Sequence, residues 1–383
     1  MAAPKLRFKE FDQIWDNLKY KDVLTIKYGK DHKLLNEGEF PVYGTGGVMR
    51  YADQYLHDGE SILIGRKGTI DQPKYVNEKF WTVDTLFYTQ IKDNSIPLFL
   101  YQHALQVNWL GLNEATGVPS LNTTSINNVD IALPSKEEQT KIATFLSAVD
   151  EKISQLSQKL HLLGQYKQGM MQKIFSQQIR FKAGDGSQFG AWESKKLNEI
   201  GQSFNGLVGK SKEDFGEGEA YITYKQIFDH RKINLNNINF VNISPNDTQN
   251  MVKKGDIFFT TSSETANEVA YCSVILDDFE FPLYLNSFCF GYRPTTSFNP
   301  YYLAFMLRSD GFRKKVTFLA QGISRFNISK TKVMDLEIFI PSLKEQTTIG
   351  NFFRQLDAAI ASHQRKLEHM QTLKKGLLQQ MFV

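Results

Sequence analysis

A segment of 45 residues occurs twice in this chain, and this repetition limits the possible folds more than any other feature. The residues from Ile131, which read IALPSKEEQTKIATFLSAVDEK, align without a gap with those from Ile338, which read IFIPSLKEQTTIGNFFRQLDAA. The offset between the copies is 207 residues, measured from Pro134 to Pro341. Repeated segments of this kind are copies of one structural unit. The chain is therefore predicted to be an internal duplication.

Both copies are predicted to be long helices. Ser135 and Ser342 are good N-caps, and Glu138 and Glu345 follow three residues later, which is the pattern of a capping box. Apolar residues then recur alternately four and three residues apart, as in the seam of a coiled coil. The predicted seam residues are Ile142, Leu146, Val149, Ile153, Leu156, Leu160 and Leu163 in the first helix, and Ile349, Phe353, Leu356, Ile360, Leu367, Met370 and Leu377 in the second. The alternative is two separate amphipathic helices, but so narrow an apolar stripe favours the coiled coil.

The repeat extends beyond the helices. Leu6-Arg7-Phe8-Lys9 recurs as Ile179-Arg180-Phe181-Lys182, and Trp15 recurs as Trp192. The predicted domains are residues 1–133, helix 134–178, residues 179–340 including a linker, and helix 341–383. In this order the second helix must begin near the end of the first and return along it. We therefore expect an α+β protein in which an antiparallel two-helix coiled coil, about 50 Å long, separates two mixed α/β domains with pseudo-twofold symmetry.

The two globular regions are alike in plan. Both contain short runs of β-branched and aromatic residues broken by Gly, Asn, Asp and Pro, which are typical of strands and turns. A short helix is expected at Pro97–Leu105 and another at Pro300–Leu307. Near the end of each region, Ala115–Asn122 aligns with Ala320–Asn327.

These features together resemble the specificity subunits of type I restriction–modification systems, over essentially the full length of the chain. The resemblance rests on the two helix starts with their Glu-Gln pairs, on Tyr43-Gly-Thr-Gly-Gly47 and Leu63-Ile-Gly-Arg-Lys-Gly68, on Trp81-Thr-Val-Asp84, and on the loops at Gly117–Asn122 and Gly322–Asn327. It implies two target-recognition domains, each reading one half of a split, asymmetric DNA site. It also implies that the helices set the spacing and dock the methyltransferase subunits. The second domain has no clear equivalent of Tyr43–Gly47, so contacts cannot be transferred there from the first.

The residue types that read DNA gather in loops of both domains. Arg, Lys, Asn, Gln, Ser and Thr contact base edges, and Lys, Arg and small polar groups bind phosphates. For 44–47 the alternative is a turn without a ligand, and for the basic residues it is a solvated surface. The candidate DNA contacts are Thr45, Gly46, Gly47, Arg50, Arg66, Lys67, Ser120, Asn122 and Thr123 in the first domain, and Lys210, Lys212, Lys225, Arg231, Thr261, Ser262, Ser324, Arg325 and Asn327 in the second.

Composition places few limits on function. The net charge of +4 permits nucleic-acid binding without demonstrating it. Cys272 and Cys289 lie in strand-like segments, which favours buried free thiols over a disulfide and fits a reducing cytoplasm. No secretory signal and no run of about 20 apolar residues is present, so a cytoplasmic protein without a membrane segment is expected.

Catalytic motifs are missing from the chain. Gly65-Arg-Lys-Gly-Thr69 lacks the glycine spacing of a P-loop, and no metal-ligand spacing occurs among the cysteines and histidines. Phe298-Asn-Pro-Tyr-Tyr302 is close to an adenine-methyltransferase motif, but it reads better as a helix start. We therefore expect a non-catalytic subunit without cofactor or metal.

The expected partners are double-stranded DNA, two methyltransferase (modification) subunits and a restriction/ATPase subunit. Two alternatives remain: a coiled-coil scaffold that bridges protein partners without touching DNA, and an adenine methyltransferase. DNA binding would weaken steeply with salt, because counterions are released on binding, and this separates it from the scaffold.

Overall fold

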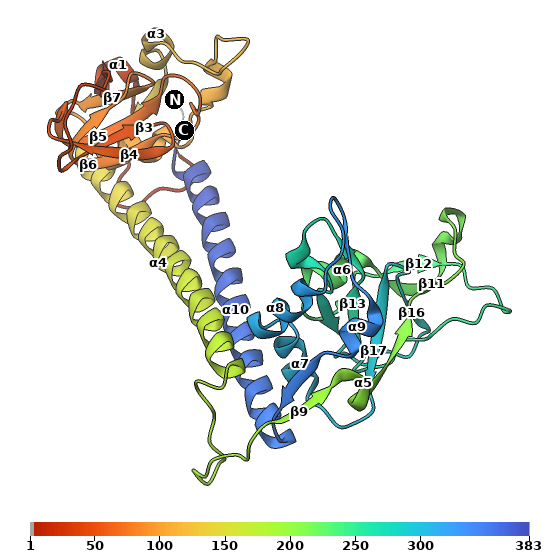
Figure 1. Ribbon diagram of the computed structural model, residues 1–383. Helices are drawn as coiled ribbons and strands as arrows, with labels where there is room; N and C mark the ends of the chain where they lie inside the picture. Colours follow the sequence, from red (N-terminus) through yellow and green to blue (C-terminus); the bar gives the residue numbers. More distant parts are fainter. Residues whose placement is uncertain (1–3, 383) are drawn as a thin grey trace. The chain divides into compact units, whose positions relative to one another are not determined.

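The computed structural model describes residues 4–382, which form two compact units (Figure 1). Unit 1 combines residues up to Lys159 with those from His363, and unit 2 spans Leu160–Ser362. Each unit contains one mixed α/β globular region, so the predicted mixture of helices and strands is confirmed. Each also contains parts of two long helices, α4 (Lys136–Phe175) and α10 (Leu343–Met381).

The globular region of unit 1 is built on a six-stranded sheet of order β2-β7-β5-β6-β3-β4. Neighbouring strands are antiparallel except β3 and β6, which are parallel. A separate antiparallel pair, β1 with β8, joins the start of the region to its end. The elements are β1 (Asp16–Lys19), α1 (Tyr20–Val23), β2 (Leu24–Tyr28), β3 (Phe40–Gly44), β4 (Gly47–Ala52), β5 (His57–Gly65), β6 (Lys74–Thr82), β7 (Leu86–Ile91), α2 (Pro97–Ala104), η1 (Trp109–Leu112), α3 (Thr123–Asn127) and β8 (Asp130–Leu133).

Unit 2 repeats part of this plan with smaller sheets. Its sheets have the orders β10-β17-β13-β15 and β12-β11-β16, and two pairs, β9-β19 and β14-β18, complete it. The elements are β9 (Glu193–Lys196), α5 (Leu197–Ile200), β10 (Gly201–Asn205), η2 (Lys212–Asp214), β11 (Phe215–Ile222), α6 (Tyr224–Asp229), β12 (Asn239–Val241), β13 (Ile257–Thr260), β14 (Ser262–Ser263), η3 (Ala266–Glu268), β15 (Cys272–Val274), β16 (Leu283–Leu285), β17 (Cys289–Pro294), α7 (Pro300–Met306), α8 (Asp310–Phe318), β18 (Phe326–Asn327), α9 (Lys330–Met334) and β19 (Glu337–Ile340).

The two short helices α2 and α7 confirm the prediction at Pro97 and Pro300. Each begins with proline at its first position, where a missing N–H costs nothing. Asn299 caps α7 by accepting a hydrogen bond from the Tyr302 backbone at 3.0 Å. The segment 298–302 is therefore a helix start, as the sequence favoured.

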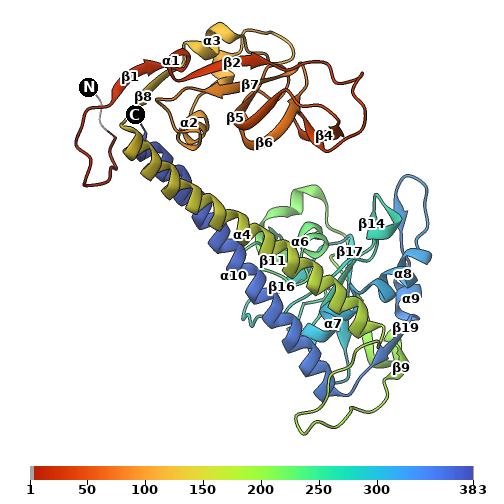
Figure 2. The same cartoon turned by 90° about the vertical axis from the view of Figure 1, so that its left-hand side faces the viewer.

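The long helices close the core of each unit. In unit 1, Ile142 and Leu146 of α4 lie in the same buried cluster as Leu378 and Met381 of α10, and Lys374 pairs with Asp150 at 2.5 Å. As the residue numbers in α4 increase, those of the residues that they approach in α10 decrease. The two helices are therefore antiparallel here (Figure 2).

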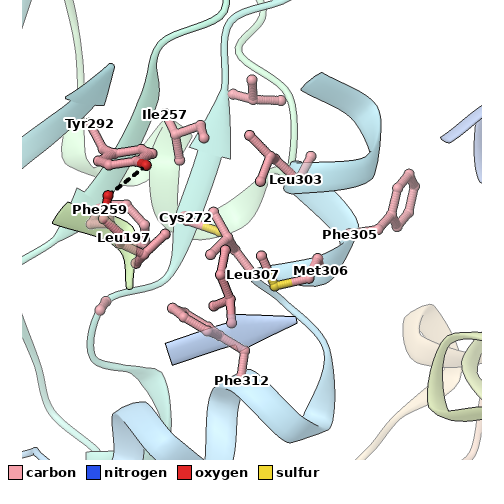
Figure 3. Close-up of a cluster of buried hydrophobic side chains, with 14 of the residues drawn as sticks. Leu197, Ile257, Phe259, Cys272, Tyr292, Leu303, Phe305, Met306, Leu307 and Phe312 are labelled. Atoms are coloured by element: carbon pink, nitrogen blue, oxygen red, sulfur yellow. Dashed lines mark hydrogen bonds between the residues drawn. The ribbon is translucent and has the colours of Figure 1, made fainter. Parts of the chain in front are cut away.

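The same direction holds in unit 2. Met171 and Ile174 of α4 share a cluster with Ile349 and Phe353 of α10, and Lys167 forms an ion pair with Asp357. Figure 3 shows Leu303 of α7, and Leu307 directly after this helix, directed toward Cys272 in this cluster, while Phe305 points away from them. The Phe305 ring stacks on Phe353 with 4.7 Å between centroids, which fastens α7 to α10.

None of the predicted seam residues is exposed. Half of them are buried and the others are partly buried, while the exposed apolar residues of the long helices lie at other positions. The buried seam residues are Ile142, Leu146, Val149, Leu156, Ile349, Phe353 and Leu356. This burial is what a coiled-coil seam requires, and the seam assignment itself stays a prediction.

The capping box predicted at each long helix is only half formed. The Ser135 and Ser342 hydroxyls accept hydrogen bonds from Glu138 and Glu345 backbones at 3.4 Å. The Glu138 carboxylate does not return to the cap. It is buried and accepts from the Arg7 guanidinium at 2.7 Å and from the Trp15 indole at 3.1 Å.

Unit 2 contains the same contact. Arg180 and Trp192 donate to the buried Glu345 carboxylate at 2.7 and 3.1 Å. We call each set a leader clamp, because it ties the segment before a globular region to the start of a long helix. The repeated leader residues and the repeated glutamates thus have one shared structural cause.

Both cysteines are buried and free, as predicted. Burial raises the pKa of both thiols, which keeps them protonated and unreactive at neutral pH. None of the helices within residues 4–382 could span a membrane, and no group of three or more His, Cys, Asp and Glu residues there is placed to bind a metal ion.

His103 makes unit 1 sensitive to acid. Its Nδ1 lies 2.9 Å from the buried Tyr20 hydroxyl, and burial lowers the His103 pKa from 6.5 to about 4. Between these values the unfolded chain binds a proton that the folded unit does not, so stability falls as the pH decreases through this range. We expect the free energy of unfolding of unit 1 to be lower by about 2 kcal/mol at pH 4.5 than at pH 7 through this group alone.

Urea unfolding at the two pH values measures this loss. Tryptophan fluorescence reports mainly on unit 1, because three of the four tryptophans, Trp15, Trp81 and Trp109, lie there. A His103→Gln variant removes the titrating group, so its stability should change about 2 kcal/mol less between the two pH values. Equal pH dependence of the variant and the unchanged protein would contradict the assignment.

Candidate nucleic-acid interface

Three of the predicted contact segments of unit 1 come together. The residues after β5 pair with the loop before α3: Leu121 donates its N–H to the Arg66 carbonyl at 2.9 Å, and Gly68 donates to the Pro119 carbonyl at 2.9 Å. Lys67 and Ser120 form an isolated β-bridge. These backbone bonds place the exposed Lys67 and the partly exposed Ser120 side by side at the end of a central strand.

The glycine-rich turn lies beside this pair. Thr45 and Gly46 join β3 to β4, and a Cβ on Gly68 would lie 3.9 Å from the Thr45 hydroxyl. Gly47 has a φ angle of +124°, a backbone conformation that is unfavourable for any residue with a side chain. A pocket lined by this turn, by Asp31–Lys33 and by Val83–Thr85 opens here. The turn therefore lies at the rim of a hollow next to Arg66–Gly68, where a ligand backbone can approach closely.

Other unit 1 candidates are occupied by local contacts. Arg50, on β4, donates to the Leu35 carbonyl at 3.2 Å and to Glu37 at 3.1 Å, so its guanidinium is held by the loop that precedes β3. Arg66 donates to the Asp84 carbonyl at 3.1 Å and lies over the Tyr28 ring. This leaves Lys67 as the exposed cation of the pair.

Asn122 has a structural role. Its side-chain oxygen accepts from the Ser125 backbone at 2.7 Å and caps α3, and its amide nitrogen donates to Glu114. Thr123, the first residue of α3, is partly exposed.

Unit 2 builds an equivalent arrangement. Thr261 and Ser262 follow β13, and Ser262 pairs with Asn327 in the ladder of β14 and β18. Ile328 donates its N–H to the Thr261 carbonyl at 3.0 Å. The exposed Arg325 donates to the Ser262 hydroxyl at 3.4 Å. Five of the candidates of unit 2, Thr261, Ser262, Ser324, Arg325 and Asn327, thus lie on two adjoining segments.

Lys225 belongs to the same neighbourhood. It is exposed on α6, next to Tyr224, whose hydroxyl donates to the Ser262 carbonyl at 2.6 Å. Tyr224, Ser324 and Arg325 line one pocket together with Glu264 and Glu268. The pocket therefore presents donors and acceptors together, as base-edge recognition requires.

The hydrogen bonds correct the alignment of the two loops. Leu121 and Ile328 make the same contact with the end of the preceding strand, and Asn122 and Ser329 cap the helices that follow. Asn327 therefore corresponds to Ser120 and not to Asn122. The unit 2 loop has two more residues between its glycine and this point, which an ungapped alignment cannot accommodate.

Lys210 and Lys212 are not part of this neighbourhood. The side chain of Lys210 is only 5% exposed and forms an ion pair with Asp247, so it joins the segment before η2 to the loop after β12. A group so enclosed is not available to a phosphate. Lys212 is exposed on η2, which is a different element from those that carry the other candidates.

Arg231 lies in another pocket, with Arg308, Arg313 and Tyr271. The guanidinium groups of Arg308 and Arg313 lie over the Tyr271 ring, 5.0 and 4.7 Å from its centroid, and both donate to backbone carbonyls. Burial, followed by the nearby Arg308 charge, lowers the Arg231 pKa. Arg308 and Arg313 are not among the candidates predicted from the sequence. Four of the eight residues 308–315 are basic, and this concentration of positive charge could have indicated them.

The family model of the type I restriction modification DNA specificity domain matches residues 13–163 and 190–371. The specificity subunit of the type I restriction enzyme MjaVIII of Methanocaldococcus jannaschii is 24% identical over 340 residues, which cover 84% of this chain and 76% of that protein. The putative type I specificity subunit S.MpnORF507P of Mycoplasma pneumoniae is 25% identical over 344 residues, which cover 87% and 86%.

A solved structure shares the fold. The crystal structure of an S subunit of a type I restriction–modification system from M. genitalium aligns with 100% of this chain and 99% of its own, with a TM-score of 0.63 at 16% identity. At this identity the likeness shows the fold alone.

Proposed function

Because the chain belongs to the type I restriction–modification DNA specificity family, we propose that each of its globular regions reads one half of a split, asymmetric DNA target. The observation that carries the proposal is the shared arrangement of the two units. In both, the end of a central strand and the loop before a short capped helix are joined by the same backbone hydrogen bond. The side chains presented there differ between the units, which is what two different half-sites require.

The chemistry of these side chains supports base readout. In unit 1 the exposed Lys67 and the partly exposed Ser120 lie beside the Thr45–Gly47 turn. In unit 2, Arg325 and Asn327 are exposed near Ser262. Arg and Lys pair with guanine, and Asn with adenine, in the major groove. Ser and Thr serve either base, so the two units would select different sequences.

We assign the long helices to spacing and assembly. In this proposal the chain is an internal duplication, and residues 1–133 and 179–340 hold the two recognition domains. The helices, 134–178 and 341–383, form an antiparallel coiled coil that fixes the spacer. Apolar side chains that remain exposed on these helices, including Leu162, Tyr166 and Leu373, would dock two methyltransferase subunits. Methyl transfer and cleavage belong in this scheme to the methyltransferase and restriction/ATPase subunits.

A domain exchange tests the proposal. Residues 20–133 are replaced by the equivalent segment of another specificity subunit, and the chain is assembled with its methyltransferase subunits. Methylated adenines are then mapped by sequencing. We expect one half of the methylated sequence to change completely while the other half stays the same. The reciprocal exchange of 197–340 is the matched control and should change only the other half.

An unchanged methylated sequence after either exchange would refute the proposal.

The salt dependence of DNA binding distinguishes the proposal from the alternative of a scaffold that does not bind DNA. If Lys and Arg side chains neutralise phosphates, affinity for duplex DNA should fall steeply between about 50 and 200 mM salt. A chain that assembles with its partners but adds no DNA affinity to them would support the scaffold instead.

A further inference from the structure

Each unit exposes one aliphatic side chain directly after the glycine of its candidate loop. We define the unit 1 loop as residues 113–120 and the unit 2 loop as residues 321–327. Val118 is 67% exposed and follows Gly117, and Ile323 is 96% exposed and follows Gly322. Single exposed apolar residues are ordinary on protein surfaces. Their recurrence after a glycine in two loops that otherwise differ is a coincidence that folding does not explain, because neither side chain contributes to a core.

Both loops are closed at their bases. In unit 1, the Asn113 side-chain oxygen accepts from the Ala115 and Ser120 backbones at 3.1 and 2.9 Å. In unit 2, Gln321 and Asn327 exchange two backbone hydrogen bonds at 2.9 and 2.8 Å. Each loop is also bonded to the end of its strand through Leu121 or Ile328. The aliphatic side chains are therefore carried on constrained loops, and burying them in a ligand costs little further ordering.

Gly322 shows that the unit 2 loop has a specified shape. Its φ is +142°, and a Cβ there would lie 2.0 Å from the Arg325 carbonyl oxygen. No other residue fits at this position. The loop is built so that Ile323 projects next to Ser324 and Arg325, both of which are exposed.

We propose that Val118 and Ile323 are apolar specificity contacts, which press against the bases of the half-site that the neighbouring polar groups read. Apolar side chains distinguish thymine through its methyl group, and aliphatic side chains also insert between base steps of duplex DNA. Val118 lies two residues from Ser120, and Ile323 two residues from Arg325, so each would meet the duplex where those groups meet it. This inference rests on the proposed function and adds contacts that carry no charge.

An apolar base contact has a distinctive signature. It releases no counterions, so its loss lowers affinity for the target without changing the salt dependence. The complex of the full chain with its methyltransferase subunits is tested on a duplex carrying the mapped methylation site and on an unrelated duplex. We expect Val118→Ser and Ile323→Ser each to weaken binding to the target about tenfold, with binding to the unrelated duplex unchanged.

Matched variants control for surface hydrophobicity and for charge. Ile14→Ser removes an aliphatic side chain that is 69% exposed in unit 1, and Phe240→Ser removes an apolar side chain that is 46% exposed on β12 in unit 2. Both should bind as the unchanged complex does. Lys67→Ala removes a charge and should, unlike the serine variants, reduce the slope of affinity against salt by about one.

Three results would overturn the inference: target affinity within twofold of the unchanged complex for both serine variants, equal losses on the two duplexes, or failure of these variants to assemble with the methyltransferase subunits. The last result would assign the loops to protein docking. If the complex without any substitution binds the target duplex and the unrelated duplex with equal affinity, the proposed function is refuted, and the inference with it.

Discussion

Replacing Glu138 with alanine is expected to lower the free energy of unfolding of unit 1 by about 3–5 kcal/mol. The carboxylate is buried and holds both Arg7 and Trp15. Without it, the guanidinium and the indole N–H lose their acceptor in a place that water reaches poorly, and the leader is released from the helix start. Urea unfolding followed by tryptophan fluorescence measures the loss, because Trp15 is itself part of the clamp.

The neighbouring glutamate is the matched control. Glu137 is exposed one residue earlier on the same helix turn, so Glu137→Ala should change the stability by less than about 0.5 kcal/mol. Glu345→Ala should destabilise unit 2 to a similar extent, through Arg180 and Trp192. A Glu138→Ala variant as stable as Glu137→Ala would show that the leader clamp is not needed for the fold.

Inserting seven residues into both long helices is expected to lengthen the spacer of the DNA target by about three base pairs, while both half-sites stay the same. Seven helical residues add about 10 Å, and one base pair occupies about 3.4 Å. A heptad also preserves the face that each helix presents to its partner. Methylation mapping of the assembled complex measures the result directly.

The ion pairs indicate where the insertions must go. Lys167 lies 17 positions after Asp150 in α4, and Lys374 lies 17 positions after Asp357 in α10. Insertions after Lys159 and after Gln364 are therefore opposite one another. The control is the same heptad placed in α4 alone, which shifts one ion pair out of register and should abolish site-specific methylation. An unchanged spacer after the double insertion would refute the assignment of the helices to spacing.

Much of the fold could be predicted because local chemistry determines it. Proline and serine mark the helix starts, and the three-and-four spacing of apolar residues marks the buried face of each helix. The partners of individual side chains could not be predicted, because they depend on residues far apart in the chain. Glu138 was expected to cap its own helix, yet its partners are Arg7 and Trp15, more than one hundred residues earlier.

The candidate site shows the same division. The sequence indicated which loops carry polar groups, and the structure joins Lys67 to Ser120 and Ser262 to Asn327. The sequence could not indicate that Asp247 forms an ion pair with Lys210, that Glu37 pairs with Arg50, or that the Asn122 side chain accepts a hydrogen bond from the Ser125 backbone. In each case a nearby group uses the charge or the hydrogen-bonding capacity that made the residue a candidate.

Unit 1 is built from two segments that lie far apart in the sequence, and this limits the order in which the protein can fold. Leu378, Met381 and Phe382 complete a core whose other members come before residue 147. On the ribosome this core must wait until residues beyond unit 2 have been made, and its apolar surface stays open in the meantime. Unit 2, which is continuous in sequence, can complete its core first. The part of the chain that is synthesised first would then be the last to reach its final structure.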